Sequence, residues 1–202
     1  MSLSIVIQAG GESQRMGTNK ALLPFLGVPL IQRVLDRVRP LASEVLITTN
    51  QPEDFEFLHL PLFPDIYPAR GALVGLHTAL SAASQPYVAV VACDMPFVNA
   101  DLLSFQLDSL IHEQVDLVVP LTGQGYEPFH AVYRRETCLP AVINALDSGL
   151  QRMISWFPQV KVRELTLEEL QRLDPSGLAF LNVNTPEEFK AAEELAQSAA
   201  SG

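Results

Sequence analysis

Apolar residues along the chain fall into two patterns that alternate. Short apolar runs are typical of strands buried on both faces of a parallel sheet, and segments with an apolar residue every three or four positions are typical of amphipathic helices. The predicted strands are residues 4–8, 44–49, 87–93, 115–120, 131–133, 160–165 and 179–183. The predicted helices are residues 30–38, 73–83, 100–112, 137–146 and a last helix that starts at Pro186. This alternation predicts one α/β domain over residues 1–202, a three-layer α/β/α Rossmann-like domain with a mostly parallel central sheet.

The last predicted helix has a clear start signal. Thr185-Pro186-Glu187-Glu188 has the form of a capping box, in which a threonine and a glutamate three residues later satisfy each other's backbone N–H groups. Proline at the first helical position fits this arrangement, because its missing N–H would be unpaired there in any case. The helix is expected to run on through Phe189 and Leu195.

A glycine-rich loop follows the first predicted strand, in Ile5-Val6-Ile7-Gln8-Ala9-Gly10-Gly11-Glu12-Ser13-Gln14-Arg15-Met16-Gly17-Thr18-Asn19-Lys20. Paired glycines let the backbone approach a ligand closely, and successive N–H groups can then face phosphate oxygens. Arg15 and Lys20 add the positive charge that a polyphosphate needs. The spacing fits neither the Walker A loop nor the dinucleotide fingerprint. Taken alone, the segment is also compatible with a chance glycine turn beside a surface lysine.

Several polar residues stand where predicted strands end, and in open α/β sheets ligands bind at the carboxyl ends of the strands. These residues are Gly10, Gly11, Thr48, Thr49, Asn50, Asp94, Asn182 and Asn184. Asp94 is costly to bury without a partner and suits a Mg²⁺ ligand. Its alternative role is to cap the next helix.

Two further segments are ambiguous on the sequence alone. Asp65 lies in a loop after a weak strand, among prolines 61, 64 and 68, where it is either a turn former or a ligand contact. Gly71 and Gly75 open a helix, either to let it pack closely on the sheet or to turn its N-terminus toward a base or phosphate.

Composition and charge narrow the function classes. Hydrophobic residues make up 48% of the 202 positions, which is typical of a packed globular protein. The net charge of −10 argues against broad nucleic-acid binding. Residues 1–40 contain five basic and two acidic residues and so carry a net charge of +3. This local positive charge suits an anionic small ligand. No apolar run is long enough for a membrane span, and no signal peptide is visible. With only two cysteines, a cytoplasmic protein is the simplest interpretation.

Other chemistries lack their motifs. The four histidines show no spacing typical of a zinc site, and Gly-x-Ser-x-Gly is absent, which argues against an α/β-hydrolase. Met153, Trp156 and Phe157 are expected to belong to the core.

Taken together, the motifs resemble the MobA-type molybdenum cofactor guanylyltransferases, within the molybdopterin nucleotidyltransferase family. The resemblance runs in order through nearly the whole chain. Its segments are Gln8 to Lys20, Gly27-Val28-Pro29-Leu30-Ile31, Pro64-Asp65, Gly71 to Leu76, Cys93-Asp94-Met95-Pro96-Phe97, Glu127 to Arg134 and Asn182 to Glu187. Members usually have leucine in place of Gln8 and often aspartate in place of Asn19. Both departures are mild, because position 8 is expected to contribute mainly its backbone.

The resemblance implies a fold like that of nucleotide-diphospho-sugar transferases and a reaction. GTP and molybdenum-molybdopterin give molybdopterin guanine dinucleotide and pyrophosphate, with Mg²⁺ as cofactor. Arg15, Lys20 and Asp94 are the implied catalytic residues, and Asp94 is the implied metal ligand. The implied nucleotide-binding residues are Gln8, Ala9, Gly10, Gly11, Lys20, Asn50, Asp65 and Asp94. Asn182 and Asn184 fall at pterin contacts, and Thr48 is an alternative to Asn50. Molybdenum-insertion and molybdoenzyme-maturation proteins are possible partners.

Three alternatives stay open. Cytidylyl transfer to the same pterin is the nearest, but relatives that use CTP tend to have Ala-Ala-Gly in place of Ala9-Gly10-Gly11. A sugar-phosphate nucleotidyltransferase fits Asn182-Val183-Asn184-Thr185-Pro186 poorly. The third is a catalytically idle nucleotide-binding protein of cofactor assembly, against which the joint presence of Arg15, Lys20 and Asp94 argues.

Overall fold

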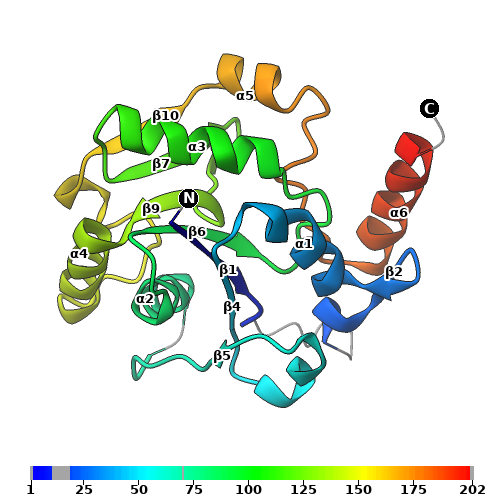
Figure 1. The fold of residues 1–202 in the computed structure, drawn as a ribbon, viewed down its shortest axis with the longest axis horizontal. Helices are drawn as coiled ribbons and strands as arrows, with labels where there is room; N and C mark the ends of the chain where they lie inside the picture. Colours follow the sequence, from blue (N-terminus) through cyan, green and yellow to red (C-terminus); the bar gives the residue numbers. More distant parts are fainter. Residues whose placement is uncertain (1, 11–18, 70, 201–202) are drawn as a thin grey trace.

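The computed structural model describes residues 2–10, 19–69 and 71–200 (Figure 1). Its strands are β1 (Leu3–Gln8), β2 (Pro24–Phe25), β3 (Val28–Pro29), β4 (Glu44–Thr48), β5 (Leu62–Phe63), β6 (Tyr87–Ala92), β7 (Leu117–Thr122), β8 (Gly125–Tyr126), β9 (His130–Arg134) and β10 (Val162–Leu165). Its α-helices are α1 (Leu30–Val38), α2 (Ala72–Ala82), α3 (Ala100–His112), α4 (Arg135–Asp147), α5 (Leu167–Leu173) and α6 (Pro186–Ala200).

One central sheet organises the chain. Its strands lie in the order β10-β7-β9-β6-β1-β4-β5, and β8 pairs with β7. The pairs β6–β1, β1–β4, β4–β5 and β7–β10 are parallel, whereas β9 is antiparallel to both of its neighbours. The mostly parallel sheet predicted from the sequence is therefore confirmed.

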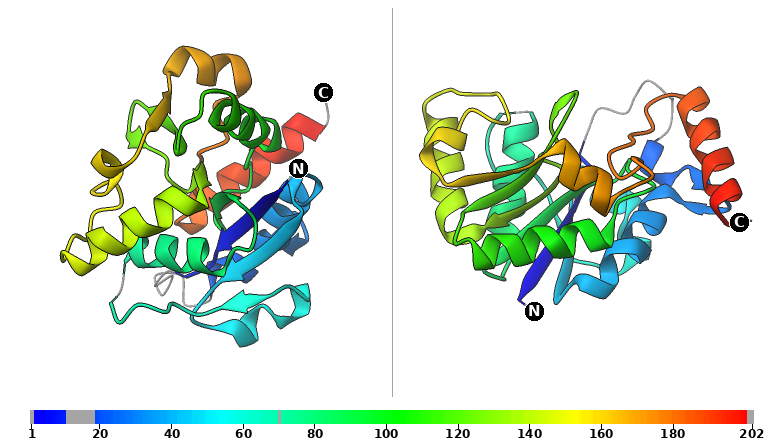
Figure 2. Two further views of the ribbon diagram at one scale, coloured as in Figure 1. Left: turned by 60° about the vertical axis from the view of Figure 1, so that its left-hand side comes forward. Right: turned by 90° about the horizontal axis from the view of Figure 1, so that it is seen from above.

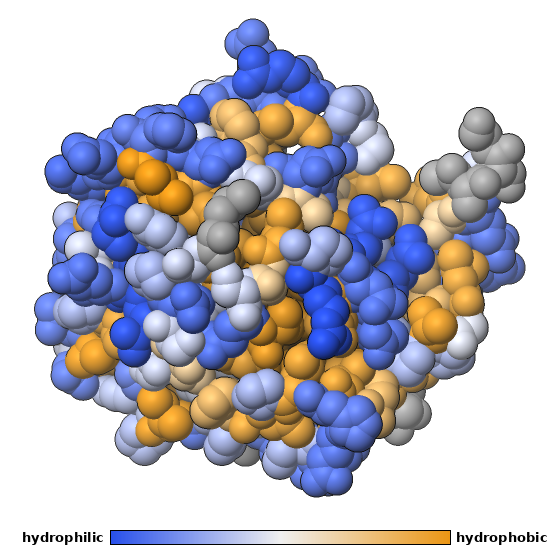
Figure 3. Space-filling view, in the orientation of Figure 1, coloured by the Kyte–Doolittle hydropathy of each residue, from blue (hydrophilic) through white to orange (hydrophobic). Residues whose placement is uncertain are grey.

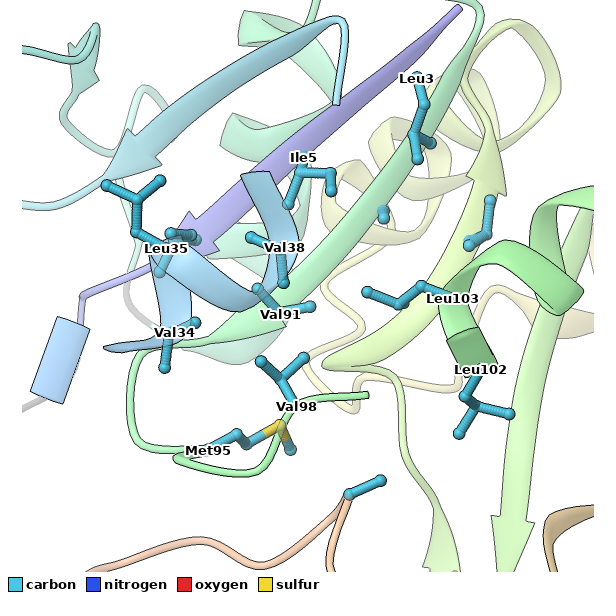
Figure 4. Close-up of a cluster of buried hydrophobic side chains, with 14 of the residues drawn as sticks. Leu3, Ile5, Val34, Leu35, Val38, Val91, Met95, Val98, Leu102 and Leu103 are labelled. Atoms are coloured by element: carbon cyan, nitrogen blue, oxygen red, sulfur yellow. The ribbon is translucent and has the colours of Figure 1, made fainter. Parts of the chain in front are cut away.

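Helices cover both faces of this sheet, as Figures 1 and 2 show. The side chains of β1 alternate between the two faces, as the period of a strand requires. Leu3, Ile5 and Ile7 pack with α1 and α3, whereas Val6 packs with α2 and α4. Figure 4 shows the first of these clusters, with Ile5 close to residues of α1 and β6. The predicted three-layer arrangement is thus confirmed, with a hydrophobic core on each side of the sheet.

The C-terminal helix α6 lies apart from these two cores. Its Phe189 packs against Phe25 of the small β2–β3 hairpin, with ring centroids 5.4 Å apart. The backbone N–H of Leu26, at the tip of this hairpin, donates to Glu193 Oε1 at 2.7 Å. Figure 1 shows α6 beside β2, at the opposite side of the molecule from α4.

The capping box predicted for α6 is confirmed. Glu188 N–H donates to Thr185 Oγ1 at 3.1 Å, and Thr185 N–H donates to Glu188 Oε2 at 3.1 Å. Trp156 and Phe157 are buried beside α4, as expected, and Met153 packs partly buried against the same core.

The strand predicted over residues 179–183 is wrong, because this segment is a loop. Its amides pair with other loops instead of a neighbouring strand. Ala179 N–H donates to Asp174 Oδ2 at 2.8 Å, and Val183 N–H donates to the Asp94 carbonyl at 3.1 Å. Helix α5 was not predicted, and β7 and β10 each begin two residues later than expected.

The two-residue strand β5 forms one end of the sheet, between Pro61 and Pro64. The Pro61 carbonyl accepts from Ile47 N–H at 3.0 Å, so even the flanking proline joins the pairing with β4.

Hydrophilic residues make up much of the outline of the face drawn in Figure 3, with groups of hydrophobic residues between them. In the part of the chain that the structure describes, no helix has the length and apolar character that a bilayer crossing requires.

Candidate functional site

A cavity of about 1340 Å³ opens where β1, β4 and β6 end. These three strands are parallel neighbours, so their carboxyl ends meet at one edge of the sheet, as the general rule for open α/β sheets predicts. The sequence-predicted residues in its lining are Gln8, Ala9, Gly10, Lys20, Thr48, Thr49, Asn50, Asp65, Asp94 and Asn182. Gly11 and Arg15 lie outside the described residues. The strand-end rule therefore gathers most of the candidates in one place.

Lys20 and Asp94 form an ion pair in this cavity. Lys20 Nζ lies 2.7 Å from Asp94 Oδ2, and the two side chains are 8% and 20% exposed. Lys20 begins a single 3₁₀ turn (Lys20–Leu22), whose start is capped by the side chain of Asn19. Asp94 follows β6, and the preceding N–H, that of Cys93, donates to the Gln8 carbonyl at 3.0 Å. Two segments far apart in the sequence thus hold opposite charges in contact.

Asp94 Oδ1 is buried and accepts no hydrogen bond within the described part of the chain. A buried carboxylate oxygen left unpaired is costly, so an orphaned oxygen beside a cavity fits a cation ligand. The capping role can be excluded, because Asn99 caps α3 by accepting from Leu102 N–H at 3.0 Å.

A magnesium ion at this position would need ligands from outside the protein. Among residues 2–10, 19–69 and 71–200, no three or more His, Cys, Asp or Glu side chains gather into a group able to hold a metal. Mg²⁺ commonly uses one or two carboxylates and completes its shell with water and phosphate oxygens. Asp94 therefore fits a magnesium ion that arrives with a phosphate ligand.

Cys93, next to Asp94, is not an available nucleophile. Burial, together with the smaller effect of the neighbouring Asp94 carboxylate, raises the pKa of its thiol to about 12. The reactive form of cysteine is the thiolate, so this side chain stays unreactive at neutral pH.

Asp65 and Asn50 meet on another wall of the cavity. Asn50 Nδ2 donates to Asp65 Oδ2 at 2.8 Å, and Asp65 N–H donates to Asn50 Oδ1 at 3.0 Å. Thr78 of α2 donates from Oγ1 to Asp65 Oδ1 at 3.2 Å. Thr48 also lines the cavity, but its carbonyl accepts from Ala9 N–H. The structure thus pairs Asp65 with Asn50, in a loop braced by α2.

Thr78 was missed by the sequence analysis. The sequence does hint that Thr78 lies near the site, because it comes three residues after Gly75 and therefore lies close to the same face of the helix. A single threonine inside a helix gives no hint of its partner, however, until the loop that carries Asp65 has been placed.

The side chain of Gln8, for which mainly a backbone role is expected, also borders the cavity. It lies against Gly75 of α2, where a Cβ atom would stand 2.4 Å from Gln8 Nε2. Nε2 is buried and has no hydrogen-bond partner among the described residues. Gly71, with φ of +136°, makes the turn that leads into α2 and lines the cavity with Ala72. The cavity is therefore bounded by the Gln8 carboxamide and by a helix N-terminus.

Asn182 and Asn184, the two asparagines expected to contact the pterin, have different partners in the structure. Asn182 lines the cavity and donates from Nδ2 to the Phe180 carbonyl at 3.2 Å. Asn184 instead accepts from Lys20 Nζ, with Oδ1 at 2.9 Å from that nitrogen. The second asparagine thus contacts the lysine of the glycine-rich loop.

Comparison with known proteins gives sequence relatives over most of the chain. Residues 5–163 match the family model described as MobA-like NTP transferase domain. The chain is 36% identical over 189 residues to a probable molybdenum cofactor guanylyltransferase of Carboxydothermus hydrogenoformans, covering 94% of each protein. It is 35% identical to a molybdenum cofactor guanylyltransferase of Desulfosudis oleivorans, covering 93% of each.

Solved structures share the fold. A molybdopterin-guanine dinucleotide biosynthesis protein A from Archaeoglobus fulgidus superposes with a TM-score of 0.82 at 24% identity, covering 96% of this chain and 99% of that one. The 2-C-methyl-D-erythritol 4-phosphate cytidylyltransferase of Thermus thermophilus gives a TM-score of 0.68 at 19% identity, covering 95% and 98%. At these identities the likeness concerns the fold, which is that of nucleotidyltransferases.

Proposed function

The chain belongs to the MobA-like NTP transferases, among the molybdenum cofactor guanylyltransferases, and from this premise we propose that it transfers GMP from GTP to molybdenum-molybdopterin and releases pyrophosphate. The observation that carries the proposal is the Lys20–Asp94 pair, in a cavity large enough for a nucleotide and with one Asp94 oxygen that has no hydrogen-bond partner among the described residues. The Lys20 ammonium can contact a phosphate, and the Asp94 carboxylate beside it can bind a cation.

The reaction needs no covalent enzyme intermediate. An oxygen of the pterin's terminal phosphate forms a bond to the α-phosphorus of GTP, and the bond from that phosphorus to the bridging oxygen breaks. The electron pair leaves with pyrophosphate. A phosphate oxygen is already an anionic nucleophile, so the protein's contribution is positioning and charge stabilisation. The protonated Cys93 thiol agrees with this, because no activated nucleophile is required.

Lys20 holds the triphosphate in this proposal, together with the backbone of Gly10 and with Gly11 and Arg15 from the same loop. A charge-assisted hydrogen bond from an ammonium to a phosphate oxygen is among the stronger polar contacts. Asp94 would hold Mg²⁺, which when bound neutralises negative charge on the α-phosphate and the departing pyrophosphate. Asn182, which lines the cavity, is proposed to contact the pterin.

Asp65, Asn50 and the N-terminus of α2 are proposed to bind the guanosine. A carboxylate accepts from N–H donors, and guanine presents a ring donor next to an exocyclic one. Cytosine reverses much of this pattern. With cytosine in the site, polar groups of the Asn50–Asp65 pair would be left without hydrogen-bond partners. Such mismatches disfavour the wrong base by several kcal/mol.

Competition between the two nucleotides tests the proposal. With purified molybdenum-molybdopterin as acceptor and Mg²⁺ present, we expect GTP to be preferred over CTP by at least ~100-fold in kcat/KM, about 2.7 kcal/mol. Pyrophosphate release should require the acceptor. Incorporation of cytidine in preference to guanosine would overturn the guanylyl assignment.

A further inference from the structure

Asn184 lies at the C-terminal end of the molecule and yet holds the lysine of the N-terminal loop. Lys20 Nζ donates to Asn184 Oδ1 at 2.9 Å and to Asp94 Oδ2 at 2.7 Å. An ammonium group has three N–H donors, so these two acceptors leave one donor for a further partner. The N–H bonds of an ammonium have tetrahedral geometry, so fixing the directions of two of them also fixes the direction of the third.

The side chain that is held in this way is otherwise a flexible one. Lysine has four rotatable bonds between its Cα atom and its ammonium, and ordering it costs conformational entropy. Here the residue is only 6% exposed. The protein meets the cost of ordering the ammonium before a ligand arrives, and such preorganisation favours binding.

Asn184 is itself clamped on both sides. The preceding N–H, that of Val183, donates to the Asp94 carbonyl at 3.1 Å, and Val183 is fully buried. The Asn184 N–H donates to Glu188 Oε2 at 2.6 Å, within the capping box of α6. The backbone that carries the Asn184 carboxamide is therefore anchored to the Asp94 loop on one side and to a helix start on the other.

We propose that Asn184 is a positioning residue for the triphosphate, which acts on the nucleotide through Lys20 and not through contact with the pterin. Its carboxamide oxygen aims the third N–H of the ammonium at a phosphate oxygen. The inference rests on the proposed function only in taking a nucleoside triphosphate as the ligand of Lys20, and it holds whichever base is used.

Nucleotide binding without acceptor separates this role from a pterin contact. We expect Asn184→Ala to weaken GTP binding by roughly tenfold in isothermal titration calorimetry with Mg²⁺, a change of about 1.4 kcal/mol. The KM for molybdenum-molybdopterin should stay within twofold. Glu187→Ala is the matched control, because this exposed residue lies in the same segment and has no place in the proposed nucleotide or pterin site; its GTP affinity should be unchanged. Circular dichroism would verify that each variant is folded.

A double-mutant cycle with Lys20→Ala identifies the route of the effect. If Asn184 acts through Lys20, then Asn184→Ala should cause no further loss of GTP affinity in the Lys20→Ala background. An equal loss in both backgrounds would overturn the proposal in favour of a general structural role. Unchanged GTP affinity with a raised pterin KM would overturn it in favour of a pterin contact.

The same titrations distinguish failure of this inference from failure of the proposed function. If the wild-type protein bound CTP and not GTP, the guanylyl assignment would fall, but the Asn184 effect should then appear with CTP. If it bound neither nucleotide, both proposals would be overturned.

Discussion

At the scale of single residues, Asp94 Oδ1, which has no hydrogen-bond partner in the described part of the chain, leads to a prediction about metal dependence. Asp94→Asn keeps the shape of the side chain but removes the charge that would hold a cation. We expect this variant to lose Mg²⁺-dependent turnover while still binding GTP weakly. Titration of activity against Mg²⁺ measures the difference, and identical metal dependence in the two proteins would show that Asp94 is not the ligand.

The contact between Gln8 and Gly75 leads to a second prediction at this scale. In Gly75→Ala the new methyl group would lie 2.4 Å from Gln8 Nε2, the end of a flexible side chain, so Gln8 should move and the helix should not. Alanine also favours a helix over glycine by up to about 1 kcal/mol. We therefore expect little change in melting temperature but a several-fold higher KM for GTP, because the displaced carboxamide takes up cavity space.

A compensating variant serves as the control. Gly75→Ala combined with Gln8→Ala should restore much of the GTP affinity if the displaced side chain is the cause. An unchanged KM in Gly75→Ala alone would mean that the Gln8 side chain lies away from the bound nucleotide.

At the scale of elements, the helices and strands with the strongest local sequence signals are the ones that the sequence predicts correctly. Helices α1 and α3 have the predicted bounds, because their apolar spacing is regular and ends sharply. Residues 179–183 form an apolar run as β1 does, but their amides bond to loops, and a short apolar run does not reveal its partner.

In the candidate site, too, some residues can be placed from the sequence and some contacts cannot. The strand-end rule placed Asp94, Asn50 and Gly10 around one cavity, because that rule depends only on element order. The bond between Lys20 and Asn184 joins residues 164 positions apart, and no local pattern in the sequence encodes such a contact.

The capping box of α6 leads to a prediction about stability. Glu188 Oε2 accepts from the backbone N–H groups of Asn184 and Thr185. We expect Glu188→Ala to lower the free energy of unfolding by about 1 kcal/mol, the usual cost of losing a helix cap. Urea denaturation measures it. Glu187→Ala, on the same first turn but without such bonds to the described residues, should change stability by only a few tenths of a kcal/mol.

At the scale of the whole molecule, buried His130 should make stability depend on pH. Burial lowers the pKa of its imidazole to about 4, and its Nε2 accepts from Asn99 N–H at 3.1 Å, which requires the neutral form. The pKa of histidine in an unfolded chain is about 6.5. Below that pH the imidazole takes up a proton when the chain is unfolded but stays neutral in the folded protein. Stability is therefore full above about pH 6.5 and falls as the pH drops toward 4.

A variant that cannot titrate isolates this contribution. His130→Gln keeps an acceptor for Asn99 N–H but takes up no proton in this range. Between pH 7 and pH 4.5 we expect the wild type to lose about 2–3 kcal/mol more unfolding free energy than the variant, since carboxylates titrate in both. Parallel stability curves for the two proteins would contradict the assignment of this loss to His130.

The two-residue strand at the end of the sheet also affects how copies of this protein meet one another. An exposed strand edge normally offers a row of N–H and C=O groups on which a strand of another chain can build, and this is a common route to aggregation. Here β5 has only Leu62 and Phe63 between two prolines, and proline has no N–H to donate. An incoming strand would find too few donors for a ladder, so this edge resists intermolecular strand addition even when the protein is concentrated.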